Sequence, residues 1–333
     1  MQRISLFILA LVATSSYAAE TPKSAPEFKM RWVLAHDPIN AFRRAASNFS
    51  RLVAKETSGK VEVEIINSRD INNGKTLSPE EVFQKLSKGE IEMSQTYTTY
   101  LGTHYDKFWA LDLPFLFRSH NHASKVLDGK IGSSIMAGLE PSHMHGLAFT
   151  YSGGFRVMPA SNREIHKVED LKGLKVRVSS DSPVATALFK QLGAEPIPVK
   201  AEVAAKDQSL DASETTYVRF WDLENKQDSH VVNDTGHSLF LTSIVINKEF
   251  FEKLPLAYQK AIEKSAKTAA FMERQDSISD GLKVKAQLAK SGYKVVTMSK
   301  KERSRMEKLS KPVYGQFEEM FGKDMIKGIQ SIY

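Results

Sequence analysis

Two arginines, Arg156 and Arg177, stand in sequence settings that could hold an anion. Arg177 lies in residues 174–178, where apolar and polar residues alternate, which predicts a strand with Arg177 facing away from the two valines. Pro183 predicts the start of a helix that ends at Gly193. Open α/β sheets bind ligands where the carboxyl end of a strand meets the start of a helix. A guanidinium group there offers a rigid set of donors that matches a carboxylate or a phosphate.

Sequence motifs for other chemistries are missing. The chain has no cysteine, which excludes disulfides and thiolate metal sites. Two His-x-His pairs, His120/His122 and His143/His145, have no third ligand placed by the sequence, so a solvated surface or loop is the better interpretation. There is no phosphate-binding loop, no nucleophile elbow and no Ser-His-Asp order. We therefore expect no metal, no cofactor and no catalytic residue.

The elements that must position the two arginines alternate between strands and helices. In the amino-terminal part, strands are predicted at 29–35, 61–66 and 91–96 and helices at 41–57, 78–88 and 120–127. Further strands are predicted at 147–151, 238–246 and 293–298. Because strands and helices alternate from the start, the sequence predicts an α/β fold with a parallel sheet.

One helical pattern is much longer than the others. Residues 255–289 contain no proline after the first position and would span roughly 50 Å at about 1.5 Å per residue. That exceeds the width of one small domain, so the helix is expected to run across two lobes. Residues 300–333 are also predicted to be helical, with breaks near Pro312 and Gly322.

The amino terminus has the pattern of a signal peptide. Arg3 precedes an apolar run at 4–13, and Ser16-Tyr17-Ala18 matches a small-x-small cleavage site, so cleavage is predicted after Ala18. No other segment is apolar enough to cross a membrane. The net charge is +7, but the lysines are spread along the chain without a nucleic-acid motif. We expect an exported, periplasmic protein that is not embedded in the membrane and binds no nucleic acid.

Several short motifs together resemble a known family. They are Gly154-x-Arg156, the run from Val168 to Val178 with Asp170-Leu171-Lys172-Gly173, and Leu192-Gly193-Ala194-x-Pro196. In this order and spacing, the sequence is similar to the periplasmic solute-binding proteins of TRAP transporters, the DctP-type receptors. The resemblance implies a two-lobe periplasmic-binding-protein-like fold with a hinge and a long helix spanning both lobes. We assign 28–148 with 238–272 to the first lobe, and 149–237 with 273–333 to the second, after a signal peptide at 1–18.

The resemblance also implies which residues touch the ligand. Arg177 matches the main carboxylate anchor of the family and Arg156 the supporting one. Thr215 stands where the family offers an amide, in a segment that departs from the family because Thr215-Thr216 replaces Asn-Pro and 202–211 is shortened.

For four further residues the sequence leaves two interpretations open. Trp221 could line an apolar wall of the cleft or pack in the core. Tyr97, His36 and His237 match positions near the ligand in relatives, and each could serve the pocket or the structure alone. Asp211 and Glu214 are interpreted as structural.

The function implied by the resemblance is that of a receptor. It would bind a small organic acid anion such as a dicarboxylate in the cleft between the lobes and deliver it to the membrane subunits of a TRAP transporter. The alternative from a different class is an exported enzyme or sensor ectodomain that reuses the same fold. An enzyme would need a base or nucleophile near the arginines.

Overall fold

The computed structural model describes residues 25–35, 40–200, 204, 207, 209–223 and 229–333. The predicted signal peptide and His36 lie outside the described residues, as does most of the shortened segment at 202–211. Among the described residues, no helix is both long and apolar enough to cross a bilayer.

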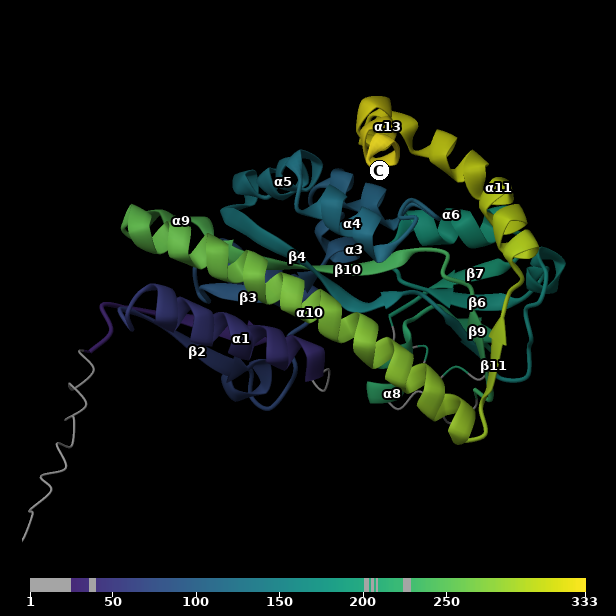
Figure 1. Ribbon diagram of the computed structural model, residues 1–333, viewed down its shortest axis with the longest axis horizontal. Coiled ribbons are helices and arrows are strands. Elements are labelled where there is room, and N and C mark those ends of the chain that lie inside the picture. The colour runs from purple at the N-terminus through teal and green to yellow at the C-terminus, as the bar shows by residue number, and fades with distance from the viewer. Residues whose placement is uncertain (1–24, 36–39, 201–203, 205–206, 208, 224–228) are drawn as a thin grey trace, which may run out of the picture.

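The first lobe is built on a five-stranded sheet in the order β2-β1-β3-β10-β4 (Figure 1). Its strands are β1 (Phe28–Leu34), β2 (Val61–Asn67), β3 (Met93–Tyr97), β4 (Met144–Phe155) and β10 (Leu239–Asn247). β1 runs parallel to β2 and β3, which confirms the predicted parallel opening. β10 is antiparallel to both β3 and β4, so the sheet as a whole is mixed.

The second lobe contains a six-stranded sheet in the order β11-β9-β5-β8-β6-β7. Its strands are short: β5 (Met158–Ala160), β6 (Lys175–Val178), β7 (Glu195–Pro198), β8 (Ala212–Ser213), β9 (Val231–Asp234) and β11 (Lys294–Thr297). The chain enters this sheet directly from β4 and leaves it into β10. Two chain crossings between the sheets therefore lie side by side, because β4 and β10 are neighbours.

The helices cover the sheets and connect them. They are α1 (Asn40–Glu56), α2 (Pro79–Ser87), α3 (Thr98–Leu101), α4 (His120–Leu127), α5 (Lys130–Ala137), α6 (Pro183–Gln191), α8 (Tyr217–Asp222), α9 (Lys248–Lys253), α10 (Leu256–Lys290), α11 (Lys300–Gln316), α12 (Glu318–Phe321) and α13 (Lys323–Ser331). Cap residues that can be recognised in the sequence set the start of two of these helices. Ser78 and Glu81 form the capping box that starts α2, and Ser182 caps α6 just before Pro183.

Helix α10 spans the molecule, as the sequence predicted. Its 35 residues pack against α1 and β4 in the first lobe and against α8 and β11 in the second (Figure 1). The face that crosses β4 buries the charged residues Glu273 and Arg274, each 1 % exposed. This helix therefore ties the two lobes together along their whole length.

Two expectations about the chain are wrong, and the first concerns the helix break predicted near Pro312. The helix at the carboxyl end does not break at Pro312, which lies inside α11. Pro312 and Lys308, four residues earlier, are both exposed, so water can satisfy the carbonyl that loses its partner. The break falls instead between α11 and α12, and again at Gly322, where φ is +84°.

The pair His120/His122 is not on a solvated surface. His122 is buried and its Nε2 lies 2.9 Å from the carbonyl oxygen of Ile329, which fastens α13 to α4. His120 packs against Tyr151 and Phe155, and burial lowers its pKa. The two side chains belong to the interior contacts of the first lobe.

Candidate functional site

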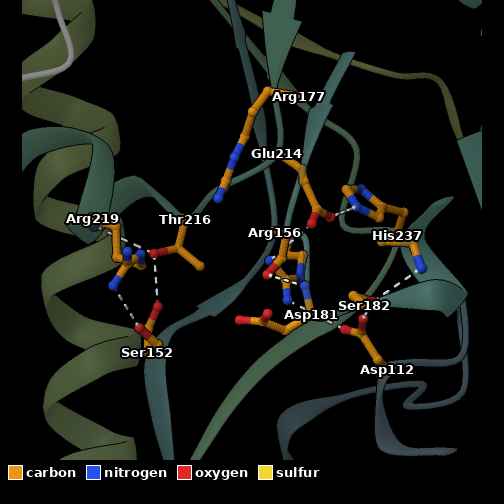
Figure 2. A network of polar contacts seen from close by, with 12 residues as sticks. Asp112, Ser152, Arg156, Arg177, Asp181, Ser182, Glu214, Thr216, Arg219 and His237 are labelled. Carbon is orange, nitrogen blue, oxygen red and sulfur yellow. Dashed lines mark hydrogen bonds and ion pairs between the residues drawn. The ribbon is translucent and has the colours of Figure 1, made fainter. Parts of the chain in front are cut away.

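Arg177 projects from β6 between two buried valines. Val176 and Val178 are 0 % exposed, whereas Arg177 on the opposite face is half-buried. Its Nε donates to the carbonyl oxygen of Val199 at 2.9 Å, which orients the guanidinium group. In Figure 2 the side chain reaches toward the space between Thr216 and Arg156. The alternation read from the sequence therefore placed this side chain on the correct face.

Arg156 directly follows β4, where the chain crosses between the lobes. It is 1 % exposed and pairs with two carboxylates, Asp112 at 3.3 Å and Glu214 at 3.4 Å. Its guanidinium carbon lies 3.8 Å from the centroid of the Phe240 ring. Its Nε has no hydrogen-bond partner within the described part of the chain. The charge of Arg156 is thus balanced inside the protein.

The two carboxylates that share Arg156 are not equivalent. Burial favours the neutral form of Glu214, but the charge of Arg156 and the contacts with His237 outweigh it and lower its pKa to about 2. Burial raises the pKa of Asp112, and Arg156 opposes this only in part because Glu214 is also near. Glu214 is therefore the main counter-charge of Arg156.

His237 belongs to the same network. It is fully buried, with Nδ1 2.8 Å from the Thr235 hydroxyl and Nε2 3.3 Å from the Glu214 carboxylate. The backbone of Glu214 also donates to the carbonyl oxygen of Arg177 at 3.0 Å. His237, Glu214 and Arg156 thus form a buried chain of contacts that reaches the strand carrying Arg177 (Figure 2).

Tyr97 stands at the end of β3, in the first lobe, and faces the second. Its ring stacks on Phe240 with centroids 5.3 Å apart. Its hydroxyl accepts a hydrogen bond from Nη1 of Arg219 at 2.5 Å. Arg219, on α8 of the second lobe, is a residue that the sequence reasoning missed. The sequence carries no signal for it, because α8 is a helix of only six residues whose orientation is set by tertiary contacts.

Thr215 and Trp221 lie on either side of Arg219 along the chain. The backbone of Thr215 pairs with that of Val157 in both directions, at 2.7 and 3.0 Å, and its side chain is half-buried. Trp221 packs against a small apolar cluster that includes Phe220, Val232 and Leu288.

The sequence reasoning also missed two polar residues that hold Arg156 in place. Asp112 ends a 3-10 helix in the first lobe, and the Ser182 hydroxyl donates to its carboxylate. Because Ser182 begins α6 in the second lobe, this contact crosses between the lobes (Figure 2). In the sequence, Ser182 is an ordinary cap and Asp112 an ordinary polar residue in an apolar segment. Their contact depends on the fold, so the sequence gives no sign of it.

Metal ligands do not converge in the described ranges. No group of three or more His, Asp or Glu side chains is placed to hold an ion there. The site is instead an arrangement of three arginines, Arg156, Arg177 and Arg219, with aromatic and hydroxyl neighbours. Arginine side chains bind anions through charge-assisted hydrogen bonds.

Comparison with known proteins matches this chain to a family. The model of the bacterial extracellular solute-binding proteins, family 7 (DctP), matches residues 36–320. The 2,3-diketo-L-gulonate-binding periplasmic protein YiaO of Escherichia coli K12 is 29% identical over 329 residues, covering 97% of this chain and 94% of that protein.

Solved structures agree with the fold. A TRAP periplasmic solute-binding protein from Polaromonas sp. JS666, bound to D-erythronate, has a TM-score of 0.80 and 26% identity over 92% of this chain and 98% of that one. A second, from Bradyrhizobium sp. BTAi1 in complex with D-galacturonate, has a TM-score of 0.80 and 27% identity over 91% and 99% of the two chains. With a family model that matches most of its length and a fold shared with these receptors, the chain belongs to the DctP family of bacterial extracellular solute-binding proteins.

Proposed function

We propose that this protein is a periplasmic receptor that reversibly binds a small organic acid between its lobes and delivers it to the membrane subunits of a TRAP transporter. The observation that carries the proposal is the group of three arginines between the two sheets of a DctP-family chain. The named relatives bind 2,3-diketo-L-gulonate, D-erythronate or D-galacturonate, and each of these is an organic acid anion.

In this proposal Arg177 is the main anchor of the ligand carboxylate. It is half-buried, and its Nε donates to the carbonyl oxygen of Val199, which orients the guanidinium group toward the region between Thr216 and Arg156 (Figure 2). Arg156 has the supporting role. Its pairing with Asp112 and Glu214 fixes its position, and its Nε is the donor left for the ligand or a bridging water.

The remaining predicted residues would shape the far end of the pocket. Tyr97 presents a ring and a hydroxyl from the first lobe, while Thr215 presents a half-buried side chain from the second. For Trp221 the contacts with the apolar cluster favour core packing. His237 is held by Thr235 and Glu214, which favours a positioning role. For His36 we keep a pocket role as a prediction from sequence.

A ligand panel separates this function from an exported enzyme or sensor ectodomain. The purified protein is incubated with mono- and dicarboxylates, keto acids and sugar acids, and thermal shift and mass spectrometry are recorded on the same samples. We expect an acid that raises the melting temperature and is recovered unchanged. A compound that is chemically converted would contradict the receptor function, and no stabilisation by any acid would contradict acid binding.

Export is the second part of the proposal. We infer that the signal peptide at 1–18 is removed after Ala18. Intact-mass measurement of the protein from a periplasmic fraction should give a chain that begins at Ala19. A chain that still begins at Met1 in that fraction would contradict the cleavage.

A further inference from the structure

The excess positive charge of this chain lies in one stretch. Residues 283–311 contain ten lysines and arginines but only two acids, Glu302 and Glu307. Because the whole chain has 46 lysines and arginines and 39 acids, the remainder of the chain has 36 of the first and 37 of the second. Lysines therefore occur throughout the sequence, whereas the net charge of +7 comes from this stretch alone.

The stretch forms one outer edge of the second lobe. It comprises the carboxyl-terminal end of α10, the strand β11, which is the last strand on one side of its sheet, and most of α11. Figure 1 shows α11 running along the outside of the molecule at this edge. The excess charge thus belongs to the outer surface of the second lobe and lies apart from the site between the lobes.

Three cationic side chains form a ridge on the exposed face of α11. Lys301, Arg305 and Lys308 are separated by four and three residues, so they lie above one another on the helix surface, and all three are exposed. The opposite face of the helix, which includes Met306 and Val313, is buried. Packing of that face holds the ridge toward solvent.

Acids balance part of this charge. Glu302 and Glu307 pair with Arg305 and Lys311 on the same helix, and Arg305 also pairs with Glu169. Three lysines that precede α11 have acid partners as well, namely Lys283, Lys285 and Lys294. These cations are neutralised within the protein, so they contribute little to the attraction of an outside anion.

Three lysines of α11 have no such partner. Lys300, Lys301 and Lys308 are exposed and form no ion pair with any residue that the structure describes. Lys300 and Lys301 also lie in the first turn of the helix, where the positive end of the helix dipole disfavours a cation. Their charges do not stabilise the helix, and they are available to an anionic partner.

The form of the ridge favours an anionic lipid surface as this partner. Its unpaired cations are lysines on a convex helix, and their flexible ammonium groups act as point charges without a fixed binding geometry. Leu309, which is 40 % exposed, lies beside Lys308 on the flank of the ridge. Lysines around an exposed leucine on one helix face are typical of helices that lie on an anionic membrane.

We propose that the second lobe docks on a bilayer of anionic phospholipid through this ridge, which consists of Lys300, Lys301, Arg305, Lys308 and Leu309. The proposed function does not require this contact, so the inference goes beyond it. Docking would hold the receptor close to the plane in which membrane subunits lie.

Flotation with lipid vesicles tests the proposal on the chain from Ala19 to Tyr333, which lacks the apolar leader. Vesicles of phosphatidylcholine alone are compared with vesicles that also contain phosphatidylglycerol. We expect binding only to the anionic vesicles, and its loss when the salt concentration rises from about 0.05 M to about 0.5 M. The double variant Lys301→Gln with Lys308→Gln should lower the partition coefficient about 10- to 25-fold, since each lysine near an anionic surface contributes about fivefold.

The matched control is Lys55→Gln with Lys88→Gln, which removes two exposed lysines from the first lobe. It should lower the partition coefficient less than about threefold, because these lysines lie away from the ridge. Thermal unfolding checks that both double variants are folded, and a thermal shift with the stabilising acid should be the same in both, so the receptor function is tested separately.

Three results would overturn the docking proposal while leaving the receptor function intact. They are equal binding to vesicles with and without phosphatidylglycerol, an equal loss in the two double variants, and retention on heparin without binding to anionic vesicles. The last result would assign the ridge to a different anionic partner.

Discussion

The three arginines of the site occupy three electrostatic settings. Arg156 is buried with two carboxylates, so removing it would leave buried acids without a partner and would cost stability. Arg219 is held by neutral groups from both lobes. Arg177 is oriented by a backbone carbonyl and is only half-buried. These settings predict that ligand affinity and stability depend on different members of the group.

At the scale of single residues, we expect Arg177→Ala to weaken binding of the acid that gives the largest thermal shift. The loss of binding free energy should be about 2–5 kcal/mol, the usual loss when one member of a buried charge pair is removed. Calorimetry measures the dissociation constant. The melting temperature of the ligand-free variant should stay close to that of the parent, because Arg177 is half-buried and its Nε donates to a backbone carbonyl, which water can satisfy in the variant. An unchanged dissociation constant would remove Arg177 from the site.

At the scale of elements, the contact of α8 with β4 depends on Gly153. Gly153→Ala combines backbone strain with overlap of Thr216, whereas Gly59→Ala places a Cβ at φ +79° with nothing within 4 Å. Denaturant unfolding should therefore show a larger loss for Gly153→Ala, by about 1–3 kcal/mol, the usual cost of overpacking. Equal losses in the two variants would mean that α8 can move away from β4.

Helix α10 carries a second element-scale feature, the buried Glu273. It accepts hydrogen bonds from the Tyr151 backbone and the Ser277 hydroxyl, and burial raises its pKa to about 8 from an ordinary 4.5. Between these values the folded state keeps a proton that the unfolded state has lost. Stability contributed by this group is therefore present below about pH 4.5 and lost as pH rises toward 8, by at most about 1.4 kcal/mol per pH unit.

Glu273→Gln should remove that dependence, because glutamine has the same shape and no charge. Urea unfolding from pH 5 to 8.5 should show the variant gaining stability relative to the parent as pH rises. Glu307→Gln, on the exposed side of α11, serves as a control with a pH-independent difference. A constant difference between Glu273→Gln and the parent would show that Glu273 does not keep its proton.

At the scale of the whole molecule, contacts between the lobes surround the site. Tyr97 meets Arg219, Asp112 meets Ser182, and β4, β10 and α10 run from one lobe to the other. If the lobes close on a ligand by a hinge motion, all of these contacts would change at the same time. Because the chain has no cysteine, Lys55→Cys on α1 and Lys190→Cys on α6 give two unique exposed labelling sites.

We expect the distribution of distances between these two labels to narrow when the stabilising acid is added at saturation. Pulsed electron spin resonance measures this distribution directly. The same labels in the Arg177→Ala variant should respond only at higher acid concentration. An identical distribution with and without saturating acid would contradict closure of the lobes.

Much of the local structure could be predicted from the sequence. The capping box at Ser78, the alternation around Arg177, the helix after Pro183 and the uninterrupted pattern of α10 each depend on residues close together in the chain. Local hydrogen bonding and periodic burial decide such features, so they are visible without a fold. The family motif around Arg177 could be recognised for the same reason.

Only the tertiary structure decided which charges are balanced. Arg156 looks like Arg177 in sequence, yet the fold brings Asp112 and Glu214 to it from distant segments and leaves Arg219 with neutral partners. The predictions of a solvated His122 and of a helix break at Pro312 were wrong for the same reason, since burial and solvent access depend on what packs against a helix. The sequence by itself determined most of the elements and the family, and it predicted Arg177 as the main anion-binding residue. Electrostatic pairing acts through space over a few ångströms between residues far apart in the chain, and for that reason it is settled only when the chain has folded.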